Sequence, residues 1–136
     1  MIHSLTSLVV LLVGIYLVGL SVVSLLHPAR AARFLTGFAR SAAAHYLELT
    51  LRLTAGAAIL FTAPKMLLSG YFVVAGWVLV ATTICLCAVP WRWHRRFAEW
   101  SVPYAVRNLR LVAVASLVLG AAVLASLFFG GGMEQS

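Results

Sequence analysis

The sequence predicts an all-α integral membrane protein, a four-helix bundle made of two parallel helical-hairpin repeats joined to interfacial amphipathic helices. Of its 136 residues, 63% are hydrophobic and only 10% are charged. A water-facing surface needs roughly a quarter to a third charged residues, so the solvent around most of this chain must be lipid. Long uncharged stretches alternate with arginine-rich linkers, and similar phrases recur in the two halves of the chain.

Three of the four predicted spans are clear. Residues 4–26 carry no charge and are long enough to cross a hydrocarbon core of about 30 Å. They lack the basic start and the small-residue cleavage site of a secretory signal, so we expect a retained helix. Residues 66–89 and 107–129 predict two further spans, and residues 130–136 predict a flexible tail.

The second span is less obvious, because its uncharged run, residues 53–63, is only 11 residues long. Extending it to residues 45–64 places Glu48 and Arg52 in its first turns. Charge favours this choice: if the segment crosses, the arginines of both linkers share one side. The positive-inside rule then puts that side in the cytoplasm and both termini on the opposite side, which is periplasmic or extracellular.

The two halves of the chain, residues 1–64 and 65–129, resemble each other. We therefore expect two hairpin repeats that each cross the membrane twice, related by a pseudo-twofold axis near the membrane normal. Two pairs of segments match: residues 14–28 correspond to residues 76–90, each running from a glycine to a proline, and residues 46–53 correspond to residues 104–111.

Both linkers are amphipathic. At 100° per residue, arginines gather on one side of a helix over residues 28–43, and the same holds for residues 90–104, where aromatic rings fill the other side. Such helices lie in the interface, with rings toward acyl chains and guanidinium groups toward phosphates. We expect anionic lipid as a partner. The predicted interface residues are Arg30, Arg33, Arg40, Arg92, Trp93, Arg95, Arg96, Phe97 and Trp100.

A polar patch is predicted at the start of the second span. A glutamate four residues before an arginine is the favourable order for a helical ion pair. The patch is either such a pair, which lets a short helix enter the membrane, or a site for an anionic headgroup, a quinone or a transported ion. With the repeat-equivalent positions, it comprises His45, Glu48, Arg52, Arg107, Asn108 and Arg110.

The amino-acid composition argues against most kinds of enzyme active site and cofactor site. The chain has three acidic residues, all glutamates, whereas hydrolases and two-metal enzymes need carboxylates grouped in one place. Cys85 and Cys87 point about 200° apart on a helix and cannot readily bridge. The four histidines lie at or beyond the predicted helix ends, which disfavours a bis-histidine haem. We expect no enzyme activity, no cofactor or metal and, despite a net charge of +7, no nucleic-acid partner.

The second half contains the motifs Pro90-x-Arg92, Arg107-Asn-Leu-Arg110-Leu111 and Ser116-x-x-Leu119-Gly120-Ala121. These motifs resemble those of the YjeT-like family of small two-helix bacterial inner-membrane proteins. The resemblance is fainter in the first half, where Ala58 stands in for Ser116. It implies a bacterial inner-membrane setting and a fused tandem copy of a hairpin, and it implies no activity.

The sequence therefore favours an accessory, assembly or scaffolding subunit of a larger inner-membrane complex, bound to a membrane protein partner or to further copies of itself. The alternative is a small oligomeric transporter or channel that uses Glu48 and Arg52. An enzyme run by Glu48 with His45 ranks third. The first two hypotheses differ in whether Glu48 and Arg52 face a water-filled cavity or a helix contact.

Overall fold

The structure, a computed structural model, describes residues 1–37 and 40–130. Within these residues the chain is all-helical, without strands, which confirms the all-α part of the predicted fold class. Four of the helices (α1, α3 with η1, α4 and α6) are long and apolar enough to cross a membrane, as the hydropathy pattern predicts. The elements are α1 (Ile2–Leu26), α2 (Pro28–Gly37), α3 (Ala42–Thr62), the 3-10 turn η1 (Ala63–Lys65), α4 (Ser69–Ala88), α5 (Trp91–Arg107) and α6 (Leu109–Gly130).

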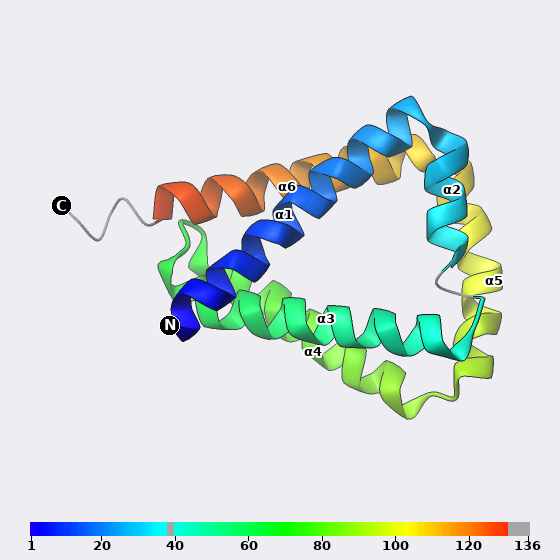
Figure 1. The fold of residues 1–136 in the computed structure, drawn as a ribbon, viewed down its shortest axis with the longest axis horizontal. Helices are drawn as coiled ribbons and strands as arrows, with labels where there is room; N and C mark the ends of the chain where they lie inside the picture. Colours follow the sequence, from blue (N-terminus) through cyan, green and yellow to red (C-terminus); the bar gives the residue numbers. More distant parts are fainter. Residues whose placement is uncertain (38–39, 131–136) are drawn as a thin grey trace.

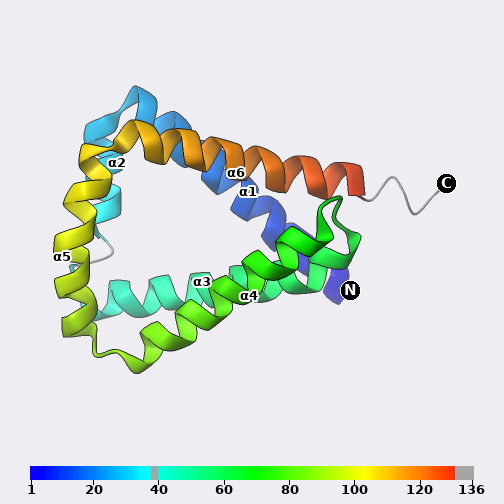
Figure 2. The ribbon, with the colours of Figure 1, turned by 180° about the vertical axis from the view of Figure 1, so that it is seen from behind.

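The long helices form two pairs. α1 packs along α6, and α3 packs along α4 (Figures 1 and 2). The pairs meet at the end that holds the N-terminus, η1 and the end of α6, and they diverge toward α2 and α5. α2 and α5 pack against each other across the wide end, so the arginine-rich linkers lie together and away from the N-terminus.

The apolar core lies at the narrow end, where all four long helices meet. Leu67 in the turn before α4 donates its backbone N–H to the Ser126 carbonyl of α6 at 3.2 Å, which ties the two helix pairs together there. In lipid such contacts are held by close van der Waals packing rather than by exclusion of water. The buried core residues are Val10, Ala58, Ile59, Ala63, Met66, Phe72 and Val123.

Within each pair the helices cross at glycines. A Cβ added to Gly120 of α6 would lie 3.1 Å from the Gly14 carbonyl oxygen of α1. A Cβ added to Gly76 of α4 would lie 3.3 Å from the Gly56 carbonyl oxygen of α3. Glycine at these crossings lets the two backbones approach closely, as is common between membrane helices.

The first linker differs from its predicted range. The sequence predicted one helix over residues 28–43, whereas α2 ends at Gly37 and α3 begins at Ala42. The new start has a local cause: the Ser41 hydroxyl accepts the Ala44 N–H at 3.1 Å and caps α3, which satisfies a donor that would otherwise be unpaired. Phe38 and Ala39 lie outside the described residues.

Other boundaries shift by a few residues. α5 continues through Pro103 to Arg107 instead of ending at residue 104, and the Asn108 side chain donates to the Tyr104 carbonyl at 3.0 Å where α5 ends. Arg107 therefore belongs to α5 and not to the last span. α4 begins at Ser69, after Leu67 is held by α6. The predicted tail lies outside the described residues except for Gly130, which ends α6.

Candidate functional site

α2 and α5 pack against each other, and each buries one small side chain. The buried residue of α2 is Ala31 and that of α5 is Ala98. With alanine at these positions the two helices can lie close together and leave their larger side chains outward. The result is a two-helix layer across the wide end of the molecule.

The outward side chains of α5 include an aromatic stripe. Trp93, Phe97 and Trp100 follow at intervals of four and three residues, and both tryptophans are 73% exposed. The Phe97 and Trp100 rings lie 6.1 Å apart. Tyr104 extends the stripe by one more turn and is also exposed. Sequence reasoning missed Tyr104 because it ended the linker there, although its spacing from Trp100 was a visible signal. Tryptophan and tyrosine are the residues that favour the membrane–water interface.

An arginine belt accompanies this stripe, defined here as Arg30, Arg33, Arg40, Arg92, Arg95 and Arg96. All six side chains are exposed. Arg95 donates through Nε to Glu99 at 3.0 Å and also lies over the Trp91 ring. Between the two linkers a shallow groove of about 310 Å³ is lined by Thr36, Arg40, Arg95 and Glu99 among others. The belt thus presents a basic surface beside an aromatic one, an arrangement that suits phosphate headgroups above acyl chains.

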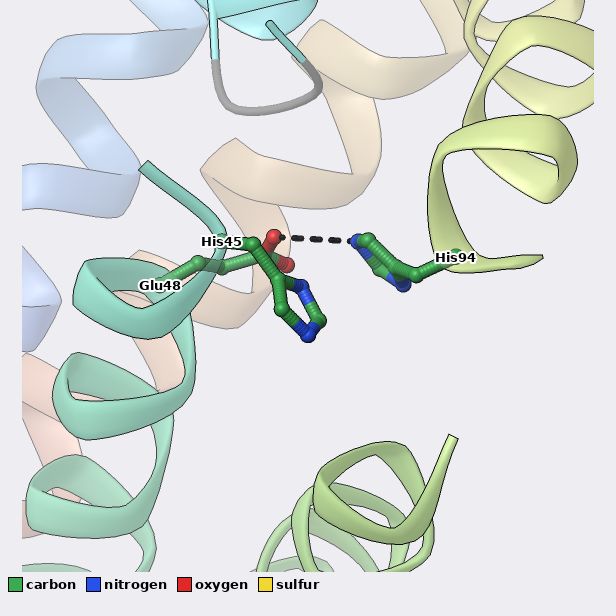
Figure 3. Close-up of side chains that lie close together, drawn as sticks. All are labelled: His45, Glu48 and His94. Carbon is green, nitrogen blue, oxygen red and sulfur yellow. Dashed lines mark ion pairs between the residues drawn. The ribbon is translucent and has the colours of Figure 1, made fainter. Parts of the chain in front are cut away.

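A polar cluster, defined as His45, Glu48, Arg52 and His94, lies where α3 begins. Arg52 Nη1 donates to Glu48 Oε1 at 3.2 Å, in the i,i+4 order that the sequence predicts. The other carboxylate oxygen, Oε2, lies 3.5 Å from His94 Nε2 of α5. The His45 and His94 rings are 4.3 Å apart between centroids. Figure 3 shows the two imidazoles approaching the Glu48 carboxylate from different helices.

The structure divides the predicted patch. His45, Glu48 and Arg52 lie together, as their spacing on one helix face requires. Arg107 ends α5, whereas His94 is in its first turn, so at 1.5 Å per residue Arg107 lies roughly 20 Å along the axis from the cluster. Asn108 follows as the C-cap of α5 and Arg110 lies in the first turn of α6, so both are at least as remote from His94 in the chain.

His94 is the member that sequence reasoning missed. It lies on the other linker, and no periodicity relates it to His45, because the contact depends on how α5 crosses the wide end. With His94 in place, Glu48 sits in a side-chain contact between two helices. Two imidazoles and one carboxylate each offer a possible metal ligand here, with the ligand atoms all within 4.8 Å of one another.

Among the described residues, three buried nitrogens of the cluster have no hydrogen-bond partner: Arg52 Nε and one on each histidine. His45 is only 3% exposed, and its Nδ1 has no hydrogen-bond partner among the described residues. The same holds for His94 Nδ1 within that part of the chain. Buried polar atoms in proteins are nearly always hydrogen-bonded or bound to a ligand, so the two imidazole nitrogens in particular require an explanation.

Fold and site together define the class: an all-helical protein with four helices able to span a membrane, two amphipathic helices across one end, and a polar cluster at their junction with α3. Comparison of the chain with protein-family models, with functionally described proteins and with solved structures gives no match.

Proposed function

We propose that the protein is a non-enzymatic accessory, assembly or scaffolding subunit of the bacterial inner membrane, which holds anionic lipid at its arginine belt. The observation that carries the proposal is the packing of α2 on α5, which gathers six exposed arginines and the aromatic stripe at one end of the molecule. Each arginine near an anionic membrane surface contributes on the order of 1 kcal/mol, and salt weakens the attraction.

We propose an orientation with the belt in the cytoplasm and the N-terminus in the periplasm. Lys65 lies in η1 at the narrow end, opposite the belt. The excess of arginine at the wide end over this single lysine among the described residues matches the positive-inside rule.

We further propose that the chain is a fusion of two helical hairpins, α1 with α3 and α4 with α6. The glycine crossings support this, because Gly14 meets Gly120 much as Gly76 meets Gly56. The first helix of each hairpin then packs on the second helix of the other. The glycine crossings make Gly56 of the first hairpin equivalent to Gly120 of the second. The sequence motifs align the hairpins differently, because matching Tyr46 with Tyr104 makes Gly56 equivalent to Val114.

The lipid proposal is tested by replacing Arg92, Arg95 and Arg96 together with glutamine. Losing three such attractions, about 3 kcal/mol in total, should weaken retention of phosphatidylglycerol or cardiolipin by roughly 100-fold, measured as lipid adducts in native mass spectrometry. The triple lysine variant keeps the charge and is the matched control, and Lys65→Gln removes a charge from the opposite end. Unaltered adducts in the glutamine variant would refute the proposal.

A transporter or channel is the second candidate, and one observation favours it: the Glu48 and Arg52 side chains remain 23% and 34% exposed. Against it, both Glu48 oxygens already face partners, Arg52 and His94, which is the helix contact that an accessory subunit requires. Proton and potassium flux into proteoliposomes distinguishes the two. An accessory subunit gives no flux above empty vesicles, whereas a channel gives flux that Glu48→Gln abolishes.

The accessory proposal also predicts a partner. Purification in a mild detergent should bring down another membrane protein or a stable homo-oligomer, identified by mass spectrometry. The exposed apolar side chains along the long helices leave ample surface for such contact. A protein that is monomeric and free of other chains under these conditions would contradict the scaffolding role.

A further inference from the structure

We propose that His45, Glu48 and His94 form a binding site for one divalent transition-metal ion, and that Zn²⁺ fits these donors best. Zinc binds imidazole nitrogen and carboxylate oxygen, and a set of two histidines and one glutamate is a known zinc ligand set. The proposal is independent of the lipid-binding role, because it uses residues outside the arginine belt.

The spacing of the donors suits one ion. Ligand atoms on tetrahedral bonds of 2.0–2.1 Å lie about 3.3 Å apart, and His94 Nε2 lies 3.5 Å from Glu48 Oε2. One ligand atom of His45 lies within 4.8 Å of the other two. Small rotations of the side chains therefore bring all three donors to bonding distance without moving a helix.

Arg52 orients the Glu48 carboxylate for metal binding. Its Nη1 donates to Glu48 Oε1, which leaves Oε2 directed at His94 and available to the ion. A hydrogen bond to the far oxygen of a ligating carboxylate is the usual outer-shell arrangement at metal sites, where it fixes the orientation of the ligand. Arg52 thus acts as a positioning residue.

Burial supports a ligand rather than a simple ion pair. The Glu48 contact accounts for His94 Nε2, but it does not explain why His45 is buried with an unpaired Nδ1 against the His94 ring. A neutral imidazole offers a lone pair to a metal ion, and this bond replaces the hydrogen bond that the buried nitrogen lacks. Three protein ligands leave a fourth position for water or an anionic group.

The ion would link the two halves of the chain. His45 and Glu48 belong to the first turns of α3, and His94 to the first turn of α5. Because few other contacts join these two helices, the metal would hold the linker of the second half against the span of the first.

The test uses the full-length protein, stripped with a chelator and titrated with Zn²⁺ and with Co²⁺ as a spectroscopic substitute. We expect one equivalent of either ion, tetrahedral Co²⁺ absorption bands, and no competition by Mg²⁺, which prefers oxygen ligands. His94→Ala or Glu48→Gln should weaken binding by at least the roughly 10- to 100-fold that loss of an outer-shell partner costs.

Matched controls separate this site from other donors. His27→Ala removes an exposed histidine at the same end of the molecule, and the Cys85→Ser/Cys87→Ser double variant removes the exposed thiols; both should bind like the wild type. Circular dichroism shows whether each variant keeps its helices, and His94→Gln serves if the alanine variant unfolds. A wild-type protein that binds no Zn²⁺, or binding that survives in folded His94 and Glu48 variants, would overturn the site while leaving the lipid result unaffected.

Discussion

At the crossing of α1 and α6, Gly120 leaves little room for a side chain. A Cβ at this position would lie 2.9 Å from Val18 Cγ2, 3.0 Å from the Val18 backbone nitrogen and 3.1 Å from the Gly14 carbonyl oxygen. Carbon atoms in good contact are 3.5–4.0 Å apart, so in Gly120→Ala the helices must separate by roughly 0.5 Å and lose about a quarter of the attraction of each affected atom pair. No rotamer change relieves contacts with backbone atoms.

We expect Gly120→Ala to destabilise the protein by about 1–3 kcal/mol, the usual cost of overpacking. Gly19→Ala is the control, since a Cβ there meets nothing within 4 Å. Both changes gain the same helix propensity, so their difference isolates the packing. Equilibrium unfolding by dodecyl sulfate in mixed micelles, followed by circular dichroism, measures both. A Gly120→Ala protein as stable as Gly19→Ala would refute the crossing.

The aromatic stripe and the α4 thiols can be tested in the same preparation. Trp93 and Trp100 are exposed beside the arginine belt, and the Trp77→Phe background removes the tryptophan within α4. In this background, lipids brominated near the headgroup should quench tryptophan fluorescence more than lipids brominated at the chain ends. The opposite order would contradict an interfacial α5. Cys85 and Cys87 are free thiols, and their angular separation on α4 should keep them so after mild oxidation. An intramolecular disulfide detected by mass spectrometry would show that α4 is not helical there.

The sequence predicts the long helices well because lipid imposes a simple demand. Every backbone group in the membrane must be paired within its own segment, so an apolar run of sufficient length implies a helix. The Glu48–Arg52 contact is equally predictable, because it depends only on the i,i+4 spacing within one helix. The end of α2 carried local signals as well, Gly37 and the Ser41 cap, which the amphipathic pattern of the linker obscured.

Contacts between segments that are distant in the chain could not be predicted from the sequence. That α1 packs on α6 and α3 on α4 follows from surface shape at glycines, and hydropathy does not record which small residues face each other. The approach of His94 to Glu48 depends on the angle at which α5 crosses the wide end. The polar cluster was therefore predicted without the residue that turns an ion pair into a three-donor site.

The proposed orientation of the arginine belt and of the polar cluster depends on α3 crossing the membrane. Lys65 and Arg33 are both exposed and lie at opposite ends of the molecule. Single cysteines at these positions, in the Cys85→Ser/Cys87→Ser background, can be labelled with an impermeant maleimide on intact cells. We predict that Lys65→Cys reacts from outside and that Arg33→Cys reacts only after lysis; labelling of both from the same side would contradict the four-span topology.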